Sequence, residues 1–208
     1  MEIKRFLDEL SSDTPTPGGG SASALAGALA ASLVVMVAGL SLKKSQPAQQ
    51  GMEEIRRKAA AIQKRLLRAI DEDAKSFEAV MKAFRLPKNS ENERLRRTRK
   101  IQKAYQKATI TPQLVCQKAV ELLGYSKTLI LEGNQNAISD AGVAAFLADA
   151  ALAGGMLNIR INLVPMTDKI FLRRMNSFMK QWGRERNHLM ERILKGLRKQ
   201  GYHEKTLM

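Results

Sequence analysis

The sequence predicts an all-α protein, a bundle of long helices around a buried, Ala-rich central helix. Apolar residues make up 44% of its 208 residues and aromatic residues only 5%, with Ala, Leu and Met dominating over Val, Tyr and Trp. That balance favours helix over strand, and the apolar residues recur at helical spacing along most of the chain. Because no repeat or low-complexity linker divides it, we interpret residues 1–208 as one domain, large enough to bury a substantial core.

The first predicted helix covers residues 3–10, whose apolar residues share one face. A Pro/Gly loop over residues 14–20 follows. Ser21 is the expected N-cap of an Ala-rich helix that runs to about Leu42. The glycine turn before it, from Pro17 to Ser21, leads into a helix N-terminus, where free N–H groups favour an anion or a carbonyl oxygen; a turn that only reverses the chain is the alternative.

The stretch from Ala22 to Leu42 is long enough to cross a bilayer, which needs about 20 apolar residues. It contains seven Ala, three Ser and two Gly, however, and Ala does not drive membrane insertion as Leu, Ile, Phe and Val do. We therefore favour a helix buried all round, in a soluble bundle or at a subunit interface, over a membrane span.

A long third helix is expected from about Gly51 to Arg85, and Pro87 ends it. Ser90 and Glu93 form a capping box for a basic helix that ends near Thr109. The next helix begins at residues 111–112 and stops at Gly133.

The remaining chain is expected to contain two more helices. Ser139 and Asp140 should cap an Ala-rich helix that runs to about Gly154. Residues 157–163 alternate between apolar and polar types as a strand does, yet a single strand has nothing to pair with, so we expect a continuing helix or an extended link. A basic helix then covers about residues 168–200, with a potential break near Gly183.

The net charge of +15 is concentrated in residues 43–68, 88–107 and 166–208. Aromatic residues do not alternate with these basic runs as a base-stacking surface requires, and no helix-turn-helix, RNA-recognition or zinc-finger signature occurs. Solvated faces or a polyanionic ligand explain the runs at least as well as nucleic acid. A basic helical nucleic-acid-binding protein is the alternative from another functional class.

Cysteine and histidine are too scarce for most metal and nucleophile chemistry. Cys116 is the single cysteine and there are two histidines, so no intramolecular disulfide or four-ligand Cys/His zinc site is expected, and the cytoplasm is the expected compartment. Any catalytic proton transfer therefore depends on carboxylates.

The segment Asp71-Glu72-Asp73 lies within the third predicted helix, and its register separates the carboxylates. Asp71 aligns with charged residues on the solvated face. Asp73 shares a face with Phe77, Val80, Met81 and Phe84. Desolvation raises the pKa of a carboxyl group toward the range of a working acid or base, which makes Asp73 the catalytic candidate; a core salt bridge or an N–H-bonded carboxylate is the structural alternative.

Four motifs occur in order between Phe6 and Leu163: PTPGGGSASALAGALAASL, IDEDAKSFEAVMKAFRLPK, GNQNAISDAGVAA and NIRINL. Together they resemble the cyclodeaminase/cyclohydrolase family of folate enzymes, which includes the C-terminal domain of formiminotransferase-cyclodeaminase and stand-alone methenyltetrahydrofolate cyclohydrolases. The resemblance implies an all-α homodimer with long helices packed across the interface, and a folate-binding groove near it.

The resemblance also implies that an aspartate of the long helix transfers the proton. On this sequence it is Asp71 or Asp73, and the helical register selects Asp73. The residues that it implies for substrate binding are Pro17, Gly18, Gly19, Gly20, Ser21, Lys88, Asn134, Ser139, Asp140, Asn158, Arg160 and Asn162. For Lys88 an exposed loop lysine is the alternative, and Ser139 is explained equally well as a helix cap.

Two reactions are implied at the N5/N10 bridge of the folate. A methenyltetrahydrofolate cyclohydrolase adds water to give 10-formyltetrahydrofolate, and a formiminotetrahydrofolate cyclodeaminase releases ammonia. Neither reaction needs a metal or a redox cofactor, and folate is the substrate. Because no formiminotransferase domain accompanies these motifs, we favour the cyclohydrolase. The positive charge would serve the anionic polyglutamate tail that folates often carry, or an unrelated acidic partner.

Overall fold

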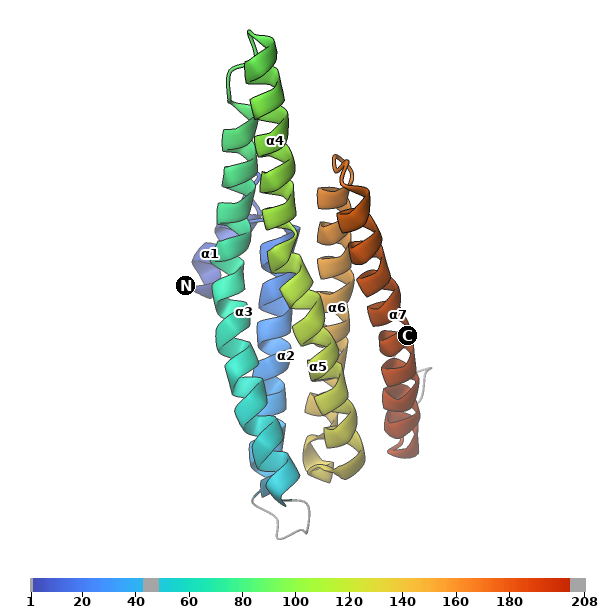
Figure 1. Ribbon diagram of the computed structural model, residues 1–208. Helices are drawn as coiled ribbons and strands as arrows, with labels where there is room; N and C mark the ends of the chain where they lie inside the picture. The colour runs from blue at the N-terminus through green and yellow to red at the C-terminus, as the bar shows by residue number, and fades with distance from the viewer. Residues whose placement is uncertain (1, 43–48, 203–208) are drawn as a thin grey trace.

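The computed structural model describes residues 2–42 and 49–202, and every regular element in those ranges is helical, which confirms the all-α prediction (Figure 1). The elements are α1 (Ile3–Leu10), α2 (Gly19–Leu42), α3 (Gln49–Phe84), α4 (Glu91–Ala108), α5 (Ile110–Glu132), the 3₁₀ turn η1 (Gln135–Ala137), α6 (Ile138–Leu163) and α7 (Lys169–Lys199). Helices α3 and α4 form a hairpin whose loop end extends beyond the rest of the bundle (Figure 1).

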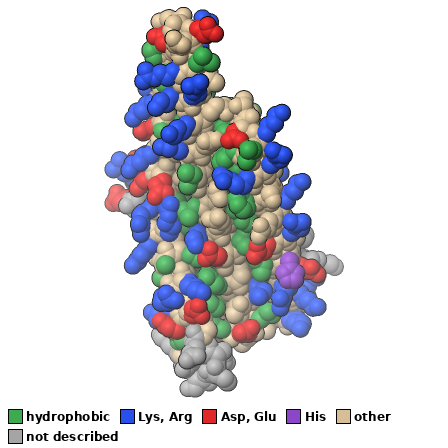
Figure 2. All heavy atoms as spheres, in the orientation of Figure 1, with side chains coloured by type: hydrophobic (Ala, Val, Ile, Leu, Met, Phe, Trp, Pro, Cys, Tyr) green, Lys and Arg blue, Asp and Glu red, His purple; other side chains and the backbone are tan. Residues whose placement is uncertain are grey.

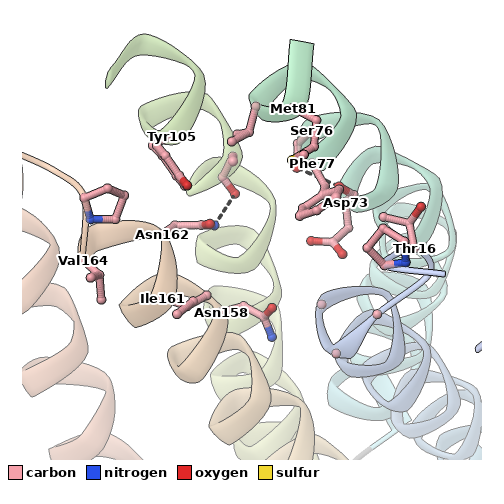
Figure 3. A pocket seen from close by; sticks show the side chains of 17 residues that line it. Thr16, Asp73, Ser76, Phe77, Met81, Tyr105, Asn158, Ile161, Asn162 and Val164 are labelled. Atoms are coloured by element: carbon pink, nitrogen blue, oxygen red, sulfur yellow. Dashed lines mark hydrogen bonds between the residues drawn. The ribbon is translucent and has the colours of Figure 1, made fainter. Parts of the chain in front are cut away.

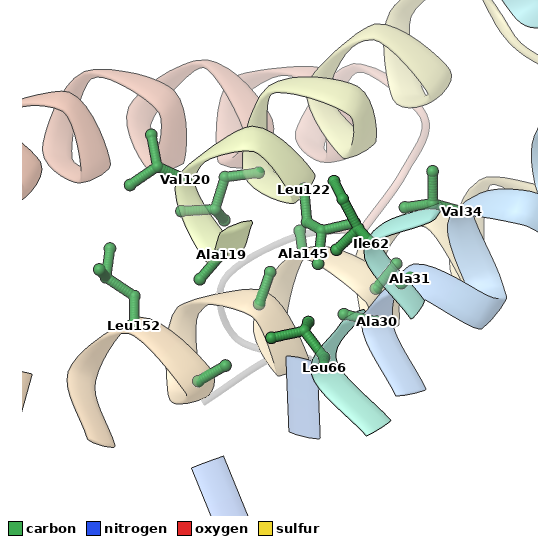
Figure 4. Packing of buried hydrophobic residues seen from close by; sticks show 14 of the residues in the cluster. Ala30, Ala31, Val34, Ile62, Leu66, Ala119, Val120, Leu122, Ala145 and Leu152 are labelled. Carbon is green, nitrogen blue, oxygen red and sulfur yellow. The ribbon is translucent and has the colours of Figure 1, made fainter. Parts of the chain in front are cut away.

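Helix α2 packs against α3, α5 and α6, and small residues set how closely they approach. A Cβ on Gly27 of α2 would lie 2.9 Å from Leu66 Cδ1 of α3, closer than real Cβ contacts. Ala30, Ala31 and Val34 of α2 are fully buried in this core, which also holds Leu66 (Figure 4). The Ala-rich composition therefore brings helix backbones together, and larger residues from the neighbours fill the remaining space.

One chain alone does not bury α2 all round, so of the two predicted settings the single-chain bundle is not sufficient. Leu29 and Met36 remain 45% and 41% exposed, on the side that α3, α5 and α6 do not cover. By length and apolar composition α2 and the segment 135–163 would each pass as membrane spans, a test that the core helices of soluble proteins also pass. What the structure adds is an apolar surface on α2 that a single copy leaves uncovered.

Helix α6 resolves the ambiguous segment 157–163. It continues without interruption to Leu163, and Leu152, Gly155, Ile159 and Leu163 are buried at helical spacing. The local alternation is therefore not a strand pattern. Because successive helical residues are rotated by about 100°, Arg160 does not share a face with Asn158 and Asn162, and the predicted grouping of these three polar residues is wrong.

Several predicted helix ends are confirmed and others are not. The Ser90/Glu93 capping box is present at α4, and α7 runs through Gly183 without a break. Ser21 is not the N-cap of α2, because the helix begins two residues earlier, at Gly19. Ser139 and Asp140 lie inside the first turn of α6, whose N-cap is Ala137, because η1 continues directly into the helix.

Candidate active site

A cavity of about 480 Å³ lies at the N-terminal end of α2, between α3, α4 and the C-terminal half of α6. Figure 3 shows side chains from these helices directed toward it. Its lining consists of Pro15, Thr16, Gly18, Gly19, Gly20, Asp73, Ser76, Phe77, Val80, Met81, Tyr105, Ala108, Asn158, Ile161, Asn162, Val164 and Pro165. The predicted face of α3 that carries Asp73, Phe77, Val80 and Met81 is thus one wall of a cavity.

The Asp73 carboxylate lies against the first turn of α2. A Cβ on Gly20 would lie 2.5 Å from Asp73 Cγ and Oδ2, so the carboxylate occupies the space that a side chain at position 20 would need. The Ser21 hydroxyl lies 3.3 Å from Asp73 Oδ2. The glycines thus allow a carboxylate from α3 to approach the positive end of the α2 dipole, where free N–H groups attract negative charge.

Burial raises the pKa of the Asp73 carboxyl above its ordinary value, and desolvation is the largest cause. The Ser21 hydroxyl and backbone N–H hydrogen-bond the carboxylate and act in the opposite direction. No salt bridge involves Asp73 among residues 2–42 and 49–202, so the salt-bridge explanation of this aspartate does not hold there. A half-buried carboxyl with a raised pKa beside a cavity is suited to exchange protons with a bound molecule.

Two amides of α6 face Asp73 across the cavity. Asn158 donates its Nδ2 to the Gly154 carbonyl at 2.8 Å, and Asn162 donates its Nδ2 to the Ala108 carbonyl at 3.2 Å. These bonds hold the two amides in place, and Figure 3 shows both side chains on the cavity wall. Within residues 2–42 and 49–202 no donor bonds their Oδ1 atoms, which leaves an acceptor on each side chain for a ligand donor.

Tyr105 is a lining residue that the sequence analysis did not select. It projects from α4 toward the cavity, and its ring contacts Phe84 edge-on at 6.2 Å between centroids (Figure 3). In the sequence it is one apolar residue of a basic helix. No spacing signal shows which side of α4 meets the cavity, because that depends on how α4 packs against α3 and α6.

The predicted substrate-binding residues divide between the cavity and other places. Five of them line it: Gly18, Gly19, Gly20, Asn158 and Asn162. The buried Ser21 does not line the cavity but contacts Asp73. The others do not line it within this chain: Pro17, Lys88, Asn134, Ser139, Asp140 and Arg160.

The places of the residues outside the cavity are specific. Pro17 borders a separate surface hollow with the exposed Asp71, on the α1 side of α3. Lys88 lies in the loop at the outer end of the α3–α4 hairpin. Asn134 precedes η1, beside Leu40 at the C-terminal end of α2, about 30 Å along that helix from Gly20.

Positive charge lies outside the cavity. Among the residues that the structure describes, no Lys or Arg lines it. Figure 2 shows Lys and Arg side chains along the α3–α4 hairpin and along α7. On α4 the basic face that includes Arg96, Lys100 and Lys103 is rotated by roughly half a turn from Tyr105, so it points away from the cavity.

The arrangement of the lining determines what the cavity can hold. Its walls are mostly apolar or aromatic, and its polar groups are two amides, a helix N-terminus and the hydroxyls of Thr16, Ser76 and Tyr105. Among residues 2–42 and 49–202, Asp73 is the one carboxylate that lines it. Within residues 2–42 and 49–202 no cluster of three or more His, Cys, Asp or Glu is placed to hold a metal ion. Such a site suits a flat organic molecule with N–H donors. Asp73 could accept a proton from that molecule or donate one to it.

The chain is similar to known folate enzymes along most of its length. A family model described as formiminotransferase-cyclodeaminase matches residues 2–181. A methenyltetrahydrofolate cyclohydrolase from Methylorubrum extorquens is 39% identical over 171 residues, which cover 81% of this chain and 82% of that protein. A formimidoyltransferase-cyclodeaminase from Rattus norvegicus is 32% identical over 81% of this chain, and the match spans only 32% of its length.

A solved structure has the same fold. The crystal structure of formiminotetrahydrofolate cyclodeaminase from Thermotoga maritima superposes with a TM-score of 0.86 at 29% identity, over 95% of this chain and 96% of the other. The similarity therefore extends over nearly all of the helices described above.

Proposed function

The chain belongs to the formiminotransferase-cyclodeaminase family, and from that premise we propose that it is a methenyltetrahydrofolate cyclohydrolase with Asp73 as general base. The observation that carries the proposal is the position of Asp73, which lines the cavity as the only carboxylate from the described part of the chain, with a raised pKa and two fixed amides opposite. The similarity to a cyclohydrolase over four fifths of both chains supports the choice of reaction.

In this reaction water attacks the amidinium-like carbon that bridges N5 and N10 of 5,10-methenyltetrahydrofolate. Asp73 accepts one proton from the water as the new C–O bond forms. The bond between that carbon and N5 then breaks as N5 takes up a proton and the hydroxyl group on the carbon loses its own. The formyl group thereby remains on N10, and the proton that Asp73 accepted is the one released overall. The apolar walls around Phe77 and Tyr105 hold the ring system, and the Asn158 and Asn162 amides orient it by accepting from its N–H groups.

Cyclodeamination of formiminotetrahydrofolate is the second candidate, and the likeness in fold to the Thermotoga maritima enzyme favours it. There N10 attacks the formimino carbon on N5, and proton transfer to the departing nitrogen releases ammonia. The same carboxyl group would carry that proton. Neither reaction requires a metal or a redox cofactor, so we propose the folate derivative as substrate without any further cofactor.

Two assays test the proposal on the same purified protein. Loss of the methenyltetrahydrofolate chromophore, at a pH where spontaneous hydrolysis is slow, measures the cyclohydrolase; ammonia release from formiminotetrahydrofolate measures the cyclodeaminase. Asp73→Asn should lower kcat/KM by about 10²–10⁴-fold, while Asp71→Asn retains the wild-type value. An unchanged kcat/KM in Asp73→Asn would remove the aspartate from the mechanism. Salt-sensitive binding of DNA or RNA without turnover of either folate would favour the nucleic-acid alternative.

We also propose a homodimer in which a second copy packs on an exposed apolar stripe of α6. Along α6, up to its C-cap Val164, the apolar residues Val143, Phe146, Ala150, Ala153, Leu157, Ile161 and Val164 recur at spacings of three or four residues, and the large ones are 38–78% exposed. That spacing forms a continuous stripe suited to helix–helix packing. Ile161 and Val164 belong both to the stripe and to the cavity wall, so a second copy on this stripe would also cover the cavity mouth.

The dimer is tested by sedimentation or light scattering. A charge in the middle of the stripe, in Leu157→Glu, should shift the protein toward monomer, whereas Leu95→Glu, at a 52% exposed leucine of α4, should not. An unchanged mass for Leu157→Glu would contradict the proposed interface.

The cytoplasm as compartment and a polyglutamylated folate as substrate remain predictions from the sequence. Because no Lys or Arg of residues 2–42 and 49–202 lines the cavity, such a tail would have to extend beyond it to meet the described basic side chains.

A further inference from the structure

The Ser21 hydroxyl lies between two acceptors and is fully buried. Its Oγ is 2.9 Å from the Ile70 carbonyl oxygen and 3.3 Å from Asp73 Oδ2, both on α3. A serine hydroxyl has one hydrogen to donate and can accept as well. It can therefore satisfy only one of these two acceptors at a time, and which one it satisfies depends on the state of Asp73.

We propose that Ser21 is a positioning residue that hydrogen-bonds Asp73 in both of its protonation states. When Asp73 is ionised, the Ser21 hydroxyl donates to the carboxylate. When Asp73 carries a proton on Oδ2, its O–H group donates a hydrogen bond to Ser21 Oγ, and the Ser21 hydroxyl donates instead to the Ile70 carbonyl. The serine keeps its own hydrogen throughout, and the transferred proton stays on Asp73.

This arrangement solves a problem that burial creates for a catalytic carboxyl. A buried polar group without a partner is costly, so a group held by donors alone resists protonation. The Ile70 carbonyl allows the Ser21 hydroxyl to reverse its role without leaving a buried hydrogen unpaired. Ser23, two residues along the same helix, differs: its hydroxyl donates to the Gly19 carbonyl at 2.6 Å and does not contact Asp73.

Within residues 2–42 and 49–202, no full charge is paired with Asp73 in competition with Ser21. Helix α2 has no ionisable residue, and the cavity walls from α4 and α6 present Tyr105, Asn158 and Asn162. On α3 itself, Glu72 pairs with Arg65 and the exposed Asp71 borders the hollow on the α1 side, with Arg5 and Glu9. The Ser21 hydroxyl and the N-terminal turn of α2 are therefore the polar groups in direct contact with the Asp73 carboxylate.

The inference rests on the proposed function in taking Asp73 as the base, so its test includes a readout that needs no substrate. The Asp73 carboxyl is titrated by NMR in ¹³C-labelled protein, with Asp73→Asn to assign its signal, and the acidic limb of the kcat/KM profile is recorded in parallel. In Ser21→Ala both should move to higher pH by about one unit, because a hydrogen bond to an ionised group is stronger than one to its neutral form. Ser23→Ala is the matched control and should move neither.

The outcomes separate the two claims. An Asp73 titration that Ser21→Ala leaves at its wild-type pH overturns the role of Ser21, whatever the activity. A shifted titration in a protein that turns over neither folate supports the role of Ser21 and refutes the proposed function. If Ser21→Ala does not fold, Ser21→Cys retains a weaker donor and should give a smaller shift in the same direction; the absence of any shift there also overturns the proposal.

Discussion

The two ends of the antiparallel pair α2 and α6 use similar polar residues for different purposes. At the cavity end, where α2 begins, Asn158 and Asn162 each donate one side-chain N–H hydrogen bond to a backbone carbonyl. The acceptor oxygen of each side chain remains available on the cavity wall. At the opposite end, where α2 finishes, Asn134 donates its N–H to Ser41 Oγ and its Nδ2 to the Leu40 carbonyl, and its Oδ1 accepts from the Asn136 N–H.

Unused hydrogen-bonding capacity distinguishes a functional polar group from a structural one. At the opposite end the bonding capacity of Asn134 is taken up by closing helix ends, so that asparagine stabilises the fold. At the cavity end the packing leaves capacity unused, and a carboxyl is held nearby with a raised pKa. The residue type is the same, and what differs is whether the backbone has already consumed its hydrogen bonds.

The largest effect that would sharpen this contrast is expected from Gly20→Ala at the cavity end. The new Cβ would lie 2.5 Å from Asp73 Cγ, so the carboxylate must move, and kcat/KM should fall by about 10²-fold while the helix remains intact. Gly124→Ala is the control, because nothing lies within 4 Å of its Cβ position; activity should be unchanged and stability higher by up to about 1 kcal/mol. Equal activity in the two variants would show that the close approach at Gly20 is irrelevant to turnover.

The next effect is expected from the cavity asparagines. Asn158→Ala and Asn162→Ala each remove an acceptor from the cavity wall, and KM should rise by about tenfold, the loss of roughly one hydrogen bond to the ligand. Steady-state kinetics measures this change, and thermal unfolding checks that each variant is folded. A drop in melting temperature with KM unaltered would mean that these amides, too, are structural.

Asn134→Ala should show the reverse pattern at the opposite end. It removes the cap of η1 and the bond to Leu40, so we expect the free energy of unfolding to fall by about 1–2 kcal/mol, with kcat/KM of the folded protein unchanged. Urea unfolding and kinetics on the same sample measure both. Lost activity in a variant of normal stability would break the comparison and bring Asn134 into the site.

The smallest effect concerns pH and stability. Because the pKa of Asp73 is raised in the folded protein, the native state binds its proton more tightly than the unfolded chain does. The stability that this contributes is present below the unfolded-state pKa and is lost as pH rises through the raised native pKa. Urea unfolding across that window should show wild type losing stability relative to Asp73→Asn, and parallel curves would mean that the Asp73 pKa is ordinary.

Much of the fold could be predicted because each helix carries its own local signals. The Ser90/Glu93 capping box, Pro87 and Gly133 mark helix ends by backbone chemistry that does not depend on the rest of the chain. The exceptions occur where tertiary contacts decide. Ser21 looked like an N-cap because a serine follows three glycines, yet its hydroxyl bonds to α3 rather than to its own helix.

The candidate site could be predicted in part, for a similar reason. The register of α3 placed Asp73 and Phe77 on one face and Asp71 on another, since the faces of a helix follow from residue spacing alone. The grouping of Arg160 with Asn158 and Asn162 failed because it assumed a period of two. Tyr105 was missed because its role depends on how α4 meets α6.

The helical class, most helix boundaries, the family resemblance and the aspartate on an apolar face can all be inferred from residue order, because propensity, capping and periodicity are local properties. Three features cannot: Gly20 makes room for that aspartate, Ser21 contacts it, and Asn134 lies at the far end of α2. These facts depend on which helices are neighbours and how closely they approach. That choice is made by packing the whole chain, which no single segment encodes.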